Sequence, residues 1–183
     1  MNDNKHIQQK NITKILIDAP IETVWAELVK TNTPLPFFFG SVCKTTGLKT
    51  GAPIRMQSPN GKNTAVAGTI TLFEPPYRYG HTFRFTNLDE PACHVTYELK
   101  ETPNGTEFSL IQEGAIAGSK TEKSMTGGAV FIVNNLKALV ETGKATGKGR
   151  MILFMIKLMG PLTPKVCRSE NWPMDMDIKM EQV

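Results

Sequence analysis

The stretch that decides the fold is residues 66–113, which read VAGTITLFEPPYRYGHTFRFTNLDEPACHVTYELKETPNGTEFSLIQE. Apolar and polar side chains alternate through four successive segments of it; the third, for example, alternates Cys93, Val95, Tyr97 and Leu99 with polar neighbours. Alternation with a period of two indicates strands that have one buried face. Because no helical pattern separates the segments, they predict an antiparallel meander.

A helical pattern follows the meander directly, over residues 120–142. Gly143 is a natural stop for this helix, and its apolar stripe consists of Met125, Ala129, Ile132, Val133, Leu136, Leu139 and Val140. Gly127 and Gly128 inside the helix each cost about 1 kcal/mol relative to alanine. They indicate either a bend near a ligand opening or tight packing against the sheet. A meander closed by one long helix predicts a curved sheet wrapped around that helix, with a cavity between the two.

Shorter elements precede the meander. Residues 11–18 alternate as a first strand does. A short helix is predicted after it, with Asp18 as the capping residue, Pro20 in the first turn and Trp25 on the apolar side. An apolar cluster broken by proline and glycine follows at residues 35–40, and we expect it to plug one end of the sheet. Two short strands are predicted after it, at residues 41–46 and 53–58.

Beyond Gly143 the chain changes character, so we assign residues 10–143 to one domain and 144–183 to a basic and apolar C-terminal extension. From Lys144 to Arg168 the extension carries six Lys or Arg residues and no acid, which suits a solvated basic face or contact with an anionic surface. Residues 150–162, RMILFMIKLMGPL, could pack on the domain, form a homodimer contact or lie on a lipid surface. We expect residues 171–183 to be a loose tail with Trp172 as its only strong anchor.

Composition narrows the classes of function. The chain has 183 residues, a net charge of +4 and 40% hydrophobic residues, which suits one domain of a soluble globular protein. No apolar run approaches the roughly 18 residues that span a bilayer, and residues 1–10 lack the apolar centre of a secretory signal. The three cysteines show neither CxxC spacing nor a disulfide framework, so we expect a reduced, cytoplasmic setting. Aromatic residues do not interleave with the basic ones, so nucleic-acid binding is not expected.

Three motifs, in this order and spacing, resemble a known family. They are residues 18–25, DAPIETVW; residues 73–78, FEPPYR; and residues 134–143, NNLKALVETG. Together they are similar to the START-like (SRPBCC) superfamily, and within it to the branch named after the heat-shock protein 90 ATPase activator homologues. The resemblance covers about residues 10–143.

The resemblance implies an α+β helix-grip fold, in which a curved antiparallel sheet wraps around a long C-terminal helix and leaves a hydrophobic cavity. The superfamily binds lipids, sterols, polyketides and other apolar ligands, and a few members are cyclases or hydrolases. The chaperone activators carry a further N-terminal domain, which we expect to be absent here because about ten residues precede the first strand. Related sequences often have Gly-Trp-Pro at the helix start, where this chain has Gly128, Ala129 and Val130. Loss of the large ring there would open the cavity mouth.

The inward faces of the predicted elements define a candidate ligand site. Its polar members are Tyr79, His81, Cys93, Tyr97 and Gln112. Its apolar members, which would enclose the body of a ligand, are Trp25, Met56, Phe83, Val95, Phe108, Leu110, Ala129 and Val133. A buried polar group left unpaired costs about 1–3 kcal/mol. The polar members would therefore orient the polar end of a ligand, or else they satisfy one another or hold buried water.

His81 could titrate near neutral pH as an acid or a base. Against catalysis, no Asp or Glu in the right strand phase is evident to orient it, since Glu74 and Glu113 only end neighbouring strands. Cys93 suits a buried structural thiol, although a pairing with His81 stays open. The three histidines lie in different segments, so no metal site is expected, and a glycine-rich phosphate loop is absent.

We therefore expect a non-catalytic protein, without a cofactor, that binds a small hydrophobic or amphipathic ligand in the cavity. The alternative is a chaperone-associated or protein-interaction module that uses the outer sheet face and the basic segment after Gly143. A third hypothesis is a cavity enzyme that uses His81 as acid or base.

Overall fold

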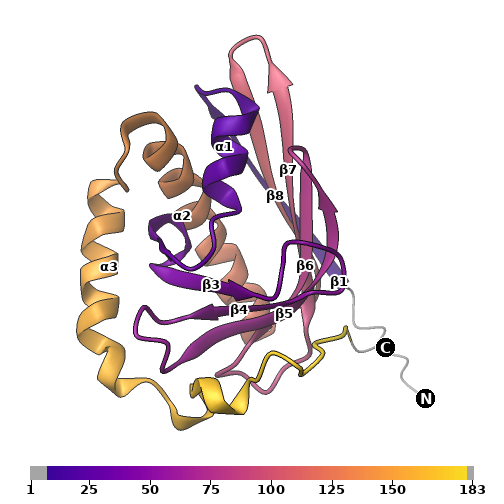
Figure 1. Cartoon of the computed structure of the whole chain (residues 1–183), viewed down its shortest axis with the longest axis vertical. Coiled ribbons are helices and arrows are strands. Elements are labelled where there is room, and N and C mark those ends of the chain that lie inside the picture. The colour runs from indigo at the N-terminus through magenta and orange to yellow at the C-terminus, as the bar shows by residue number, and fades with distance from the viewer. Residues whose placement is uncertain (1–7, 181–183) are drawn as a thin grey trace.

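Eight antiparallel strands form one sheet in the computed structural model, which describes residues 8–180 (Figure 1). The strand order is β1-β8-β7-β6-β5-β4-β3-β2, so the first strand pairs with the last. The strands are β1 Gln8–Ile17, β2 Pro34–Leu35, β3 Ser41–Thr45, β4 Pro53–Gln57, β5 Thr64–Glu74, β6 Arg78–Phe85, β7 Cys93–Thr102 and β8 Gly105–Ile116. The predicted meander is β5 to β8, and the expected curled α+β fold is confirmed. The first strand begins earlier than expected, and the residues before it lie outside the described part.

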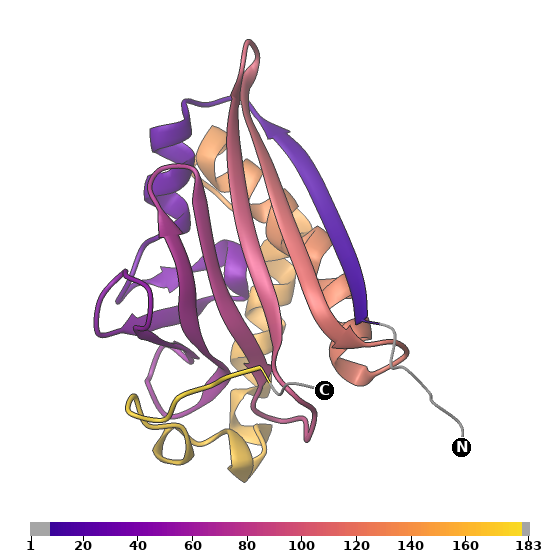
Figure 2. The ribbon, with the colours of Figure 1, turned by 90° about the vertical axis from the view of Figure 1, so that its right-hand side faces the viewer.

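The long helix α2, Lys120–Thr142, has the bounds that the sequence predicts. Ser119 caps its start by accepting a hydrogen bond from the Glu122 N–H, and Gly143 ends it in the left-handed conformation at φ 72°. Its apolar side packs on β1 and β8 behind the strands, as Figure 2 shows. The helix runs unbroken through its two glycines. A Cβ atom at Gly127 would meet no described atom within 4 Å, so tight packing does not require a glycine there.

Helix α1, Ile21–Leu28, buries Val24, Trp25 and Leu28 against the sheet. The predicted cap at Asp18 is wrong, because Pro20 occupies the N-cap position and no side chain caps the helix. Asp18 instead donates its backbone N–H to Glu141 Oε1 at 2.7 Å. This bond ties the start of α1 to the end of α2.

The apolar cluster forms a plug beside α2, which we define as residues 34–40. It contains β2 and the short 3-10 helix η1, Pro36–Phe38, and it buries Phe37 and Phe38. Phe39 has a left-handed backbone at φ 54°, and its ring stacks on Phe131 of α2 with centroids 4.2 Å apart. The plug therefore covers the part of the sheet that α2 does not reach.

The C-terminal extension crosses from the helical side of the sheet to its outer face. Helix α3, Gly147–Met159, leaves the end of α2, and three 3-10 turns follow it, η2 Gly160–Leu162, η3 Lys165–Cys167 and η4 Ser169–Asn171. The expectation of a loose tail is wrong for residues 171–180, and the last three residues lie outside the described part. Trp172 and Ile178 are buried with Ala67 of β5, and Thr82 donates its hydroxyl to the Ile178 carbonyl at 2.5 Å.

Arg55 of β4 holds this tail. Its side chain is fully buried and donates to the carbonyl oxygens of Trp172 at 3.0 Å, Pro173 at 2.6 Å and Met176 at 2.6 Å. The planar guanidinium suits this role because its five donors diverge in a fixed fork. Burial lowers the pKa of Arg55, and nearby Asp175 acts in the opposite direction.

The division of the chain at residue 143 into domain and extension stays a prediction.

Among the described residues, no helix is long and apolar enough to cross a membrane.

Replacing Arg55 by methionine should lower the free energy of unfolding by roughly 3 kcal/mol, because several buried carbonyl groups lose their donor. The tail should also detach, so that trypsin cuts at Lys165 and Arg168 in the otherwise folded protein. Urea unfolding and limited proteolysis measure the two effects. Arg84→Met is the matched control, because Arg84 lies on the same face, stacks over the Trp172 ring at 5.7 Å and pairs with Asp89 at 4.0 Å, but donates to no carbonyl group of the described tail. Equal losses in the two variants would contradict the role given to Arg55.

Candidate functional site

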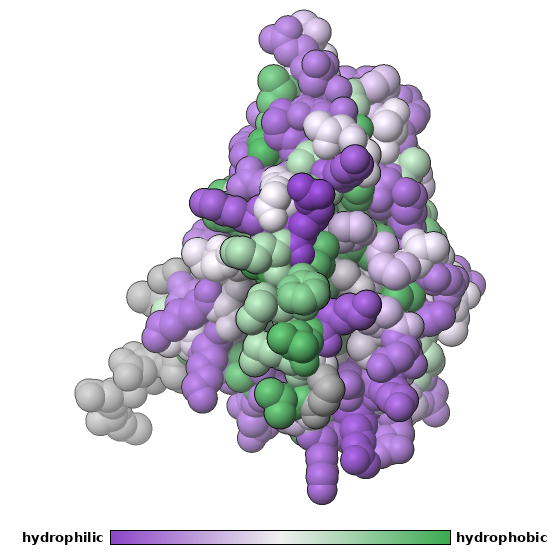
Figure 3. All heavy atoms as spheres, turned by 90° about the vertical axis from the view of Figure 1, so that its left-hand side faces the viewer, coloured by the Kyte–Doolittle hydropathy of each residue, from purple (hydrophilic) through white to green (hydrophobic). Residues whose placement is uncertain are grey.

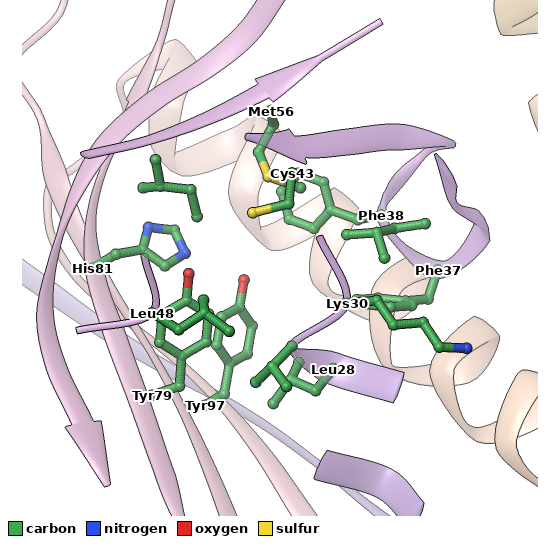
Figure 4. A pocket seen from close by; sticks show the side chains of 13 residues that line it. Leu28, Lys30, Phe37, Phe38, Cys43, Leu48, Met56, Tyr79, His81 and Tyr97 are labelled. Carbon is green, nitrogen blue, oxygen red and sulfur yellow. The ribbon is translucent and has the colours of Figure 1, made fainter. Parts of the chain in front are cut away.

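A small pocket lies between the end of α1, the plug and the inner face of the sheet (Figure 4). Its volume is about 20 Å³, which holds a water molecule but is far below the roughly 300 Å³ of a typical ligand pocket. Val29, Lys30 and Leu48 are its more exposed members and mark its mouth. The complete lining is Leu28, Val29, Lys30, Leu35, Phe37, Phe38, Cys43, Leu48, Ile54, Met56, Tyr79, His81 and Tyr97.

The inner wall of the pocket is a cluster of rings on β6 and β7. Tyr79 and Tyr97 are cross-strand partners, and their ring centroids are 5.6 Å apart. His81 follows two residues after Tyr79 on the same face, with its ring 5.5 Å from Tyr79 and 5.8 Å from Tyr97. The period-two alternation that the sequence shows places all three side chains together. In Figure 4 the imidazole faces the hydroxyl ends of both tyrosines.

His81 is neutral at physiological pH. Its Nδ1 lies 2.8 Å from the Thr82 carbonyl oxygen, so Nδ1 carries the hydrogen and Nε2 is left as an acceptor. Burial lowers the pKa of His81 to about 4, against a smaller upward effect of the Thr82 bond. The pKa of His81 therefore lies below the neutral range expected from the sequence, because burial disfavours the charged imidazolium.

The Tyr79 hydroxyl is a buried donor without a partner. Among the described residues, no group is placed to hydrogen-bond its Oη. Burial raises the pKa values of Tyr79 and Tyr97, so both phenols stay protonated. An unpaired buried hydroxyl typically costs about 1–3 kcal/mol and calls for an occupant such as a bound water or a ligand oxygen. Its position beside the free Nε2 of His81 makes a donor and acceptor pair on an otherwise apolar wall.

The buried thiols are protonated as well. Burial raises the pKa of Cys43, in the pocket, to about 11 and that of Cys93 to about 12. Cys93 lies outside the pocket, where its Sγ donates to the Phe83 carbonyl at 3.3 Å and contacts the Met125 sulfur at 3.1 Å. Since the thiolate is the reactive form, neither cysteine is prepared for nucleophilic attack.

The structure brings only part of the predicted site together. Met56, Tyr79, His81 and Tyr97 line the pocket. The other predicted residues are buried around it without lining it: Trp25, Phe83, Cys93, Val95, Phe108, Leu110, Gln112, Ala129 and Val133.

This pocket does not lie at the predicted position, which is between the sheet and the long helix. No described residue of α2 lines the pocket, because Ala129 and Val133 pack directly on their neighbours in the core. The Gln112 side chain also shows that β8 lies close to α2, because its Nε2 donates to the Met125 carbonyl at 3.0 Å. The free space lies instead where α1, the plug and the short strands meet.

Sequence reasoning missed most of the lining from the first third of the chain. These residues come from the end of α1, the plug, the following loop and two short strands, and none of these segments shows a long periodic pattern. One signal was present. The run Leu35 to Phe39 is strongly apolar although proline breaks it, which indicates side chains that fill a space rather than an amphipathic element.

A second, open hollow lies on the outer face of the sheet. Its volume is about 350 Å³, and it is lined by Lys14, Tyr77, Arg78, Glu98, Leu99, Lys100, Glu107 and Ser109. Exposed ion pairs cross it, Lys14 with Glu107 at 3.0 Å and Arg78 with Glu98 at 3.4 Å. Its larger volume does not make it the better ligand site, because it is shallow, charged and solvated.

Comparison with known proteins relates this geometry to a family and to solved structures. The sequence pattern of the family described as "Activator of Hsp90 ATPase homolog 1-like protein" matches residues 18–141. No curated protein matches the chain. CalU16 from Micromonospora echinospora is 20% identical and has a TM-score of 0.59 over 81% of this chain and 83% of that one. MLL2253 from Mesorhizobium loti is 18% identical, with a TM-score of 0.60 over 73% and 97%. SSP2350 from Staphylococcus saprophyticus is 20% identical, with a TM-score of 0.60 over 75% and 96%. These structures share the fold of this chain.

The buried neutral His81 should make stability depend on pH. Between about pH 6.5 and pH 4 the unfolded chain binds a proton that the folded protein does not, so stability falls as the pH falls. Urea unfolding at about pH 7 and pH 4.5 should show that the wild type loses roughly 2–3 kcal/mol more than His81→Gln. Equal losses in the two proteins would show that His81 is charged or solvated in the folded state.

Tyr79→Phe should leave the free energy of unfolding unchanged or raise it by up to about 1 kcal/mol, because it removes a hydroxyl that has no partner. Thr86→Val is the matched control, since the buried Thr86 hydroxyl donates to the Thr64 carbonyl at 2.5 Å, and its loss should cost about 1 kcal/mol. Chemical denaturation compares the two. A loss in Tyr79→Phe as large as that in Thr86→Val would mean that the Tyr79 hydroxyl is hydrogen-bonded in solution.

Proposed function

The chain belongs to the family of activator of Hsp90 ATPase homolog 1-like proteins, and from this premise we propose that it binds one small apolar or amphipathic molecule in the pocket, without catalysing a reaction. The observation that carries the proposal is the unpaired Tyr79 hydroxyl beside the free Nε2 of the neutral His81. An unpaired donor beside an unpaired acceptor does not stabilise a folded core. The two groups do increase the affinity for a ligand that completes both hydrogen bonds.

The chemistry of the wall narrows the ligand class. Tyr79 offers a neutral donor and His81 a neutral acceptor, while leucine, phenylalanine, isoleucine and methionine make up most of the remaining lining. A hydroxyl or carbonyl oxygen at the end of an apolar body fits this wall. A buried carboxylate does not, because the one lysine of the pocket, Lys30, pairs with Glu27 at the mouth and points outward in Figure 4.

Ligand uptake requires the pocket to open, since about 20 Å³ holds no ligand of this class. The plug is the element that would move. It is bounded by residues with left-handed backbones, Asn32 at φ 61° before it and Phe39 at φ 54° in its last turn. Such conformations are unfavourable for residues with side chains, so a shift of the plug would release part of that cost. Phe37 and Phe38 would then swing away from the ring cluster.

Catalysis is not part of the proposal. A general base that works near neutral pH needs a pKa near that pH, and burial holds the pKa of His81 at about 4. The pocket thiol of Cys43 is protonated for the same reason. The three cysteines are free and buried, which fits a reducing compartment.

A protein-interaction module is the second candidate, favoured by the open charged hollow on the outer face between Lys14, Arg78 and Glu98. A chaperone or another protein would use that surface, and substitutions in the pocket would leave its binding intact.

Mass spectrometry of the purified protein, first under native and then under denaturing conditions, tests the proposal. We expect a retained small molecule that is released on denaturation, or stoichiometric uptake of added dodecanol by an empty protein. Leu48→Trp should block the mouth and abolish both, whereas Leu72→Trp, a half-buried control outside the pocket, should not. Tyr79→Phe should weaken binding about tenfold, the cost of one hydrogen bond. Equal binding by Leu48→Trp, or no binding by the wild type, would overturn the proposal.

A further inference from the structure

Helix α3 presents large apolar side chains to solvent. Met151 is 63% exposed, Phe154 66% and Leu158 66%. The same surface continues over Ile152, Met155, Ile156, Met159, Leu162 and Val166, each at least a third exposed. Figure 3 shows these apolar side chains gathered on one face of the molecule, with polar residues around them. A contiguous apolar patch of this kind marks a contact surface rather than ordinary scatter.

The helix is oriented with its apolar side outward. Gly149 packs on Asn135 of α2 so closely that a Cβ atom would lie 2.0 Å from Asn135 Oδ1, and Leu153 lies against Gly40 at the end of the plug. At 100° per residue, Phe154 and Leu158 project from the opposite side of the helix. A helix that packs on its own domain shows the reverse arrangement, with the large apolar residues inside.

Both ends of α3 are held in place. At the start, Asn135 Oδ1 accepts from the Thr146 N–H and from the Thr146 hydroxyl, both at 3.0 Å, and Thr146 in turn caps the helix. Beyond its end, Arg55 holds the tail through the carbonyl groups of Trp172, Pro173 and Met176. The fold therefore fixes the exposed face of α3 in one orientation. The apolar side chains on that face stay in contact with water, which is unfavourable until a partner covers them.

Basic side chains border the patch, and one of them, Arg168, pairs with Glu170 at 3.5 Å. Arg150 and Lys157, seven residues apart, lie on the same flank of α3, and Lys144, Lys148, Lys165 and Arg168 surround its ends. No acidic residue occurs from Lys144 to Arg168. The patch thus combines an apolar centre with a basic border, and it is complementary to a surface that is apolar inside and anionic at its boundary.

We propose that α3 is an interfacial helix that attaches this protein to an anionic lipid bilayer, with Phe154 and Leu158 in the acyl boundary and the basic border on lipid phosphates. Apolar area and attraction to anionic headgroups add in such binding. With 13 residues, α3 is about 20 Å long, shorter than the roughly 30 Å hydrocarbon core, so it lies flat on the bilayer.

A second copy of the chain fits the patch less well. Antiparallel two-fold pairing of α3 helices would bring the basic flanks of both copies together, and residues 144–168 supply no acidic residue to neutralise them. Lipid phosphates remove that repulsion. The proposal does not depend on whether the pocket holds a ligand. Because α3 contacts the plug at Gly40, attachment through α3 would place the plug close to the bilayer.

Vesicle flotation of the full chain tests the proposal. We expect the protein to float with vesicles of phosphatidylcholine that contain about 30 mol % phosphatidylglycerol, and to stay behind with phosphatidylcholine alone. The double variant Phe154→Glu with Leu158→Glu should lose the binding. Arg150→Gln with Lys157→Gln should weaken partitioning by roughly 30-fold and reduce its dependence on salt. Lys100→Gln with Lys123→Gln, which removes two exposed charges elsewhere, is the matched control and should bind as the wild type does.

Two results would overturn the proposal. One is a wild-type protein that stays unbound at both vesicle compositions. The other is a dimer in sedimentation velocity that the Phe154→Glu and Leu158→Glu variant dissociates while vesicle binding is absent, which would make a second copy the occupant. Circular dichroism and urea unfolding confirm that each variant is folded. Because the substituted side chains are exposed, these variants should unfold at the same urea concentration as the wild type.

Discussion

A curved eight-stranded sheet has one apolar face that must be covered, and a single helix is too narrow to cover it. Strands about 4.8 Å apart make this sheet roughly 34 Å wide, whereas a helix with its side chains is about 10 Å across. Helix α2 therefore covers β1 and β8, and α1 covers part of β7 and β8. The plug fills the remaining space with Phe37 and Phe38. The pocket is the gap left where these separate covers meet.

The ring cluster of Tyr79, His81 and Tyr97 contains buried polar groups that lower the stability of the core. Tyr79, His81 and Tyr97 lie on the apolar face because their strand positions point there, and burial then removes the water that their polar atoms would bind. His81 responds by remaining neutral, and the Tyr79 hydroxyl stays unpaired. Polar groups that weaken the core while facing a small void are typical of a site whose purpose is binding, which is why the proposal of a ligand rests on them.

The outer face of the sheet is covered in part by the C-terminal tail, which Arg55 holds in place. Arg55 lies on that face among Ala67 and Arg84 of the neighbouring strands, and its buried charge is satisfied by carbonyl groups of the tail. The tail follows α3 in the chain and crosses from the helical side of the sheet to its outer face (Figure 1). One buried guanidinium therefore fixes the segment that covers this face and that follows the apolar helix in the chain.

The sequence by itself determined the elements whose signals are local. Period-two alternation predicted β5 to β8, and helical spacing with Gly143 as the stop predicted α2. The same alternation placed Tyr79, His81 and Tyr97 on one face. Only the tertiary structure decided where the cavity lies, how the tail is held and which way α3 faces. Each of these depends on contacts between residues far apart in the chain, such as Arg55 with Trp172 and Asn135 with Thr146. Local periodicity carries no information about such pairs, because it reports which side of an element is apolar and not what covers it.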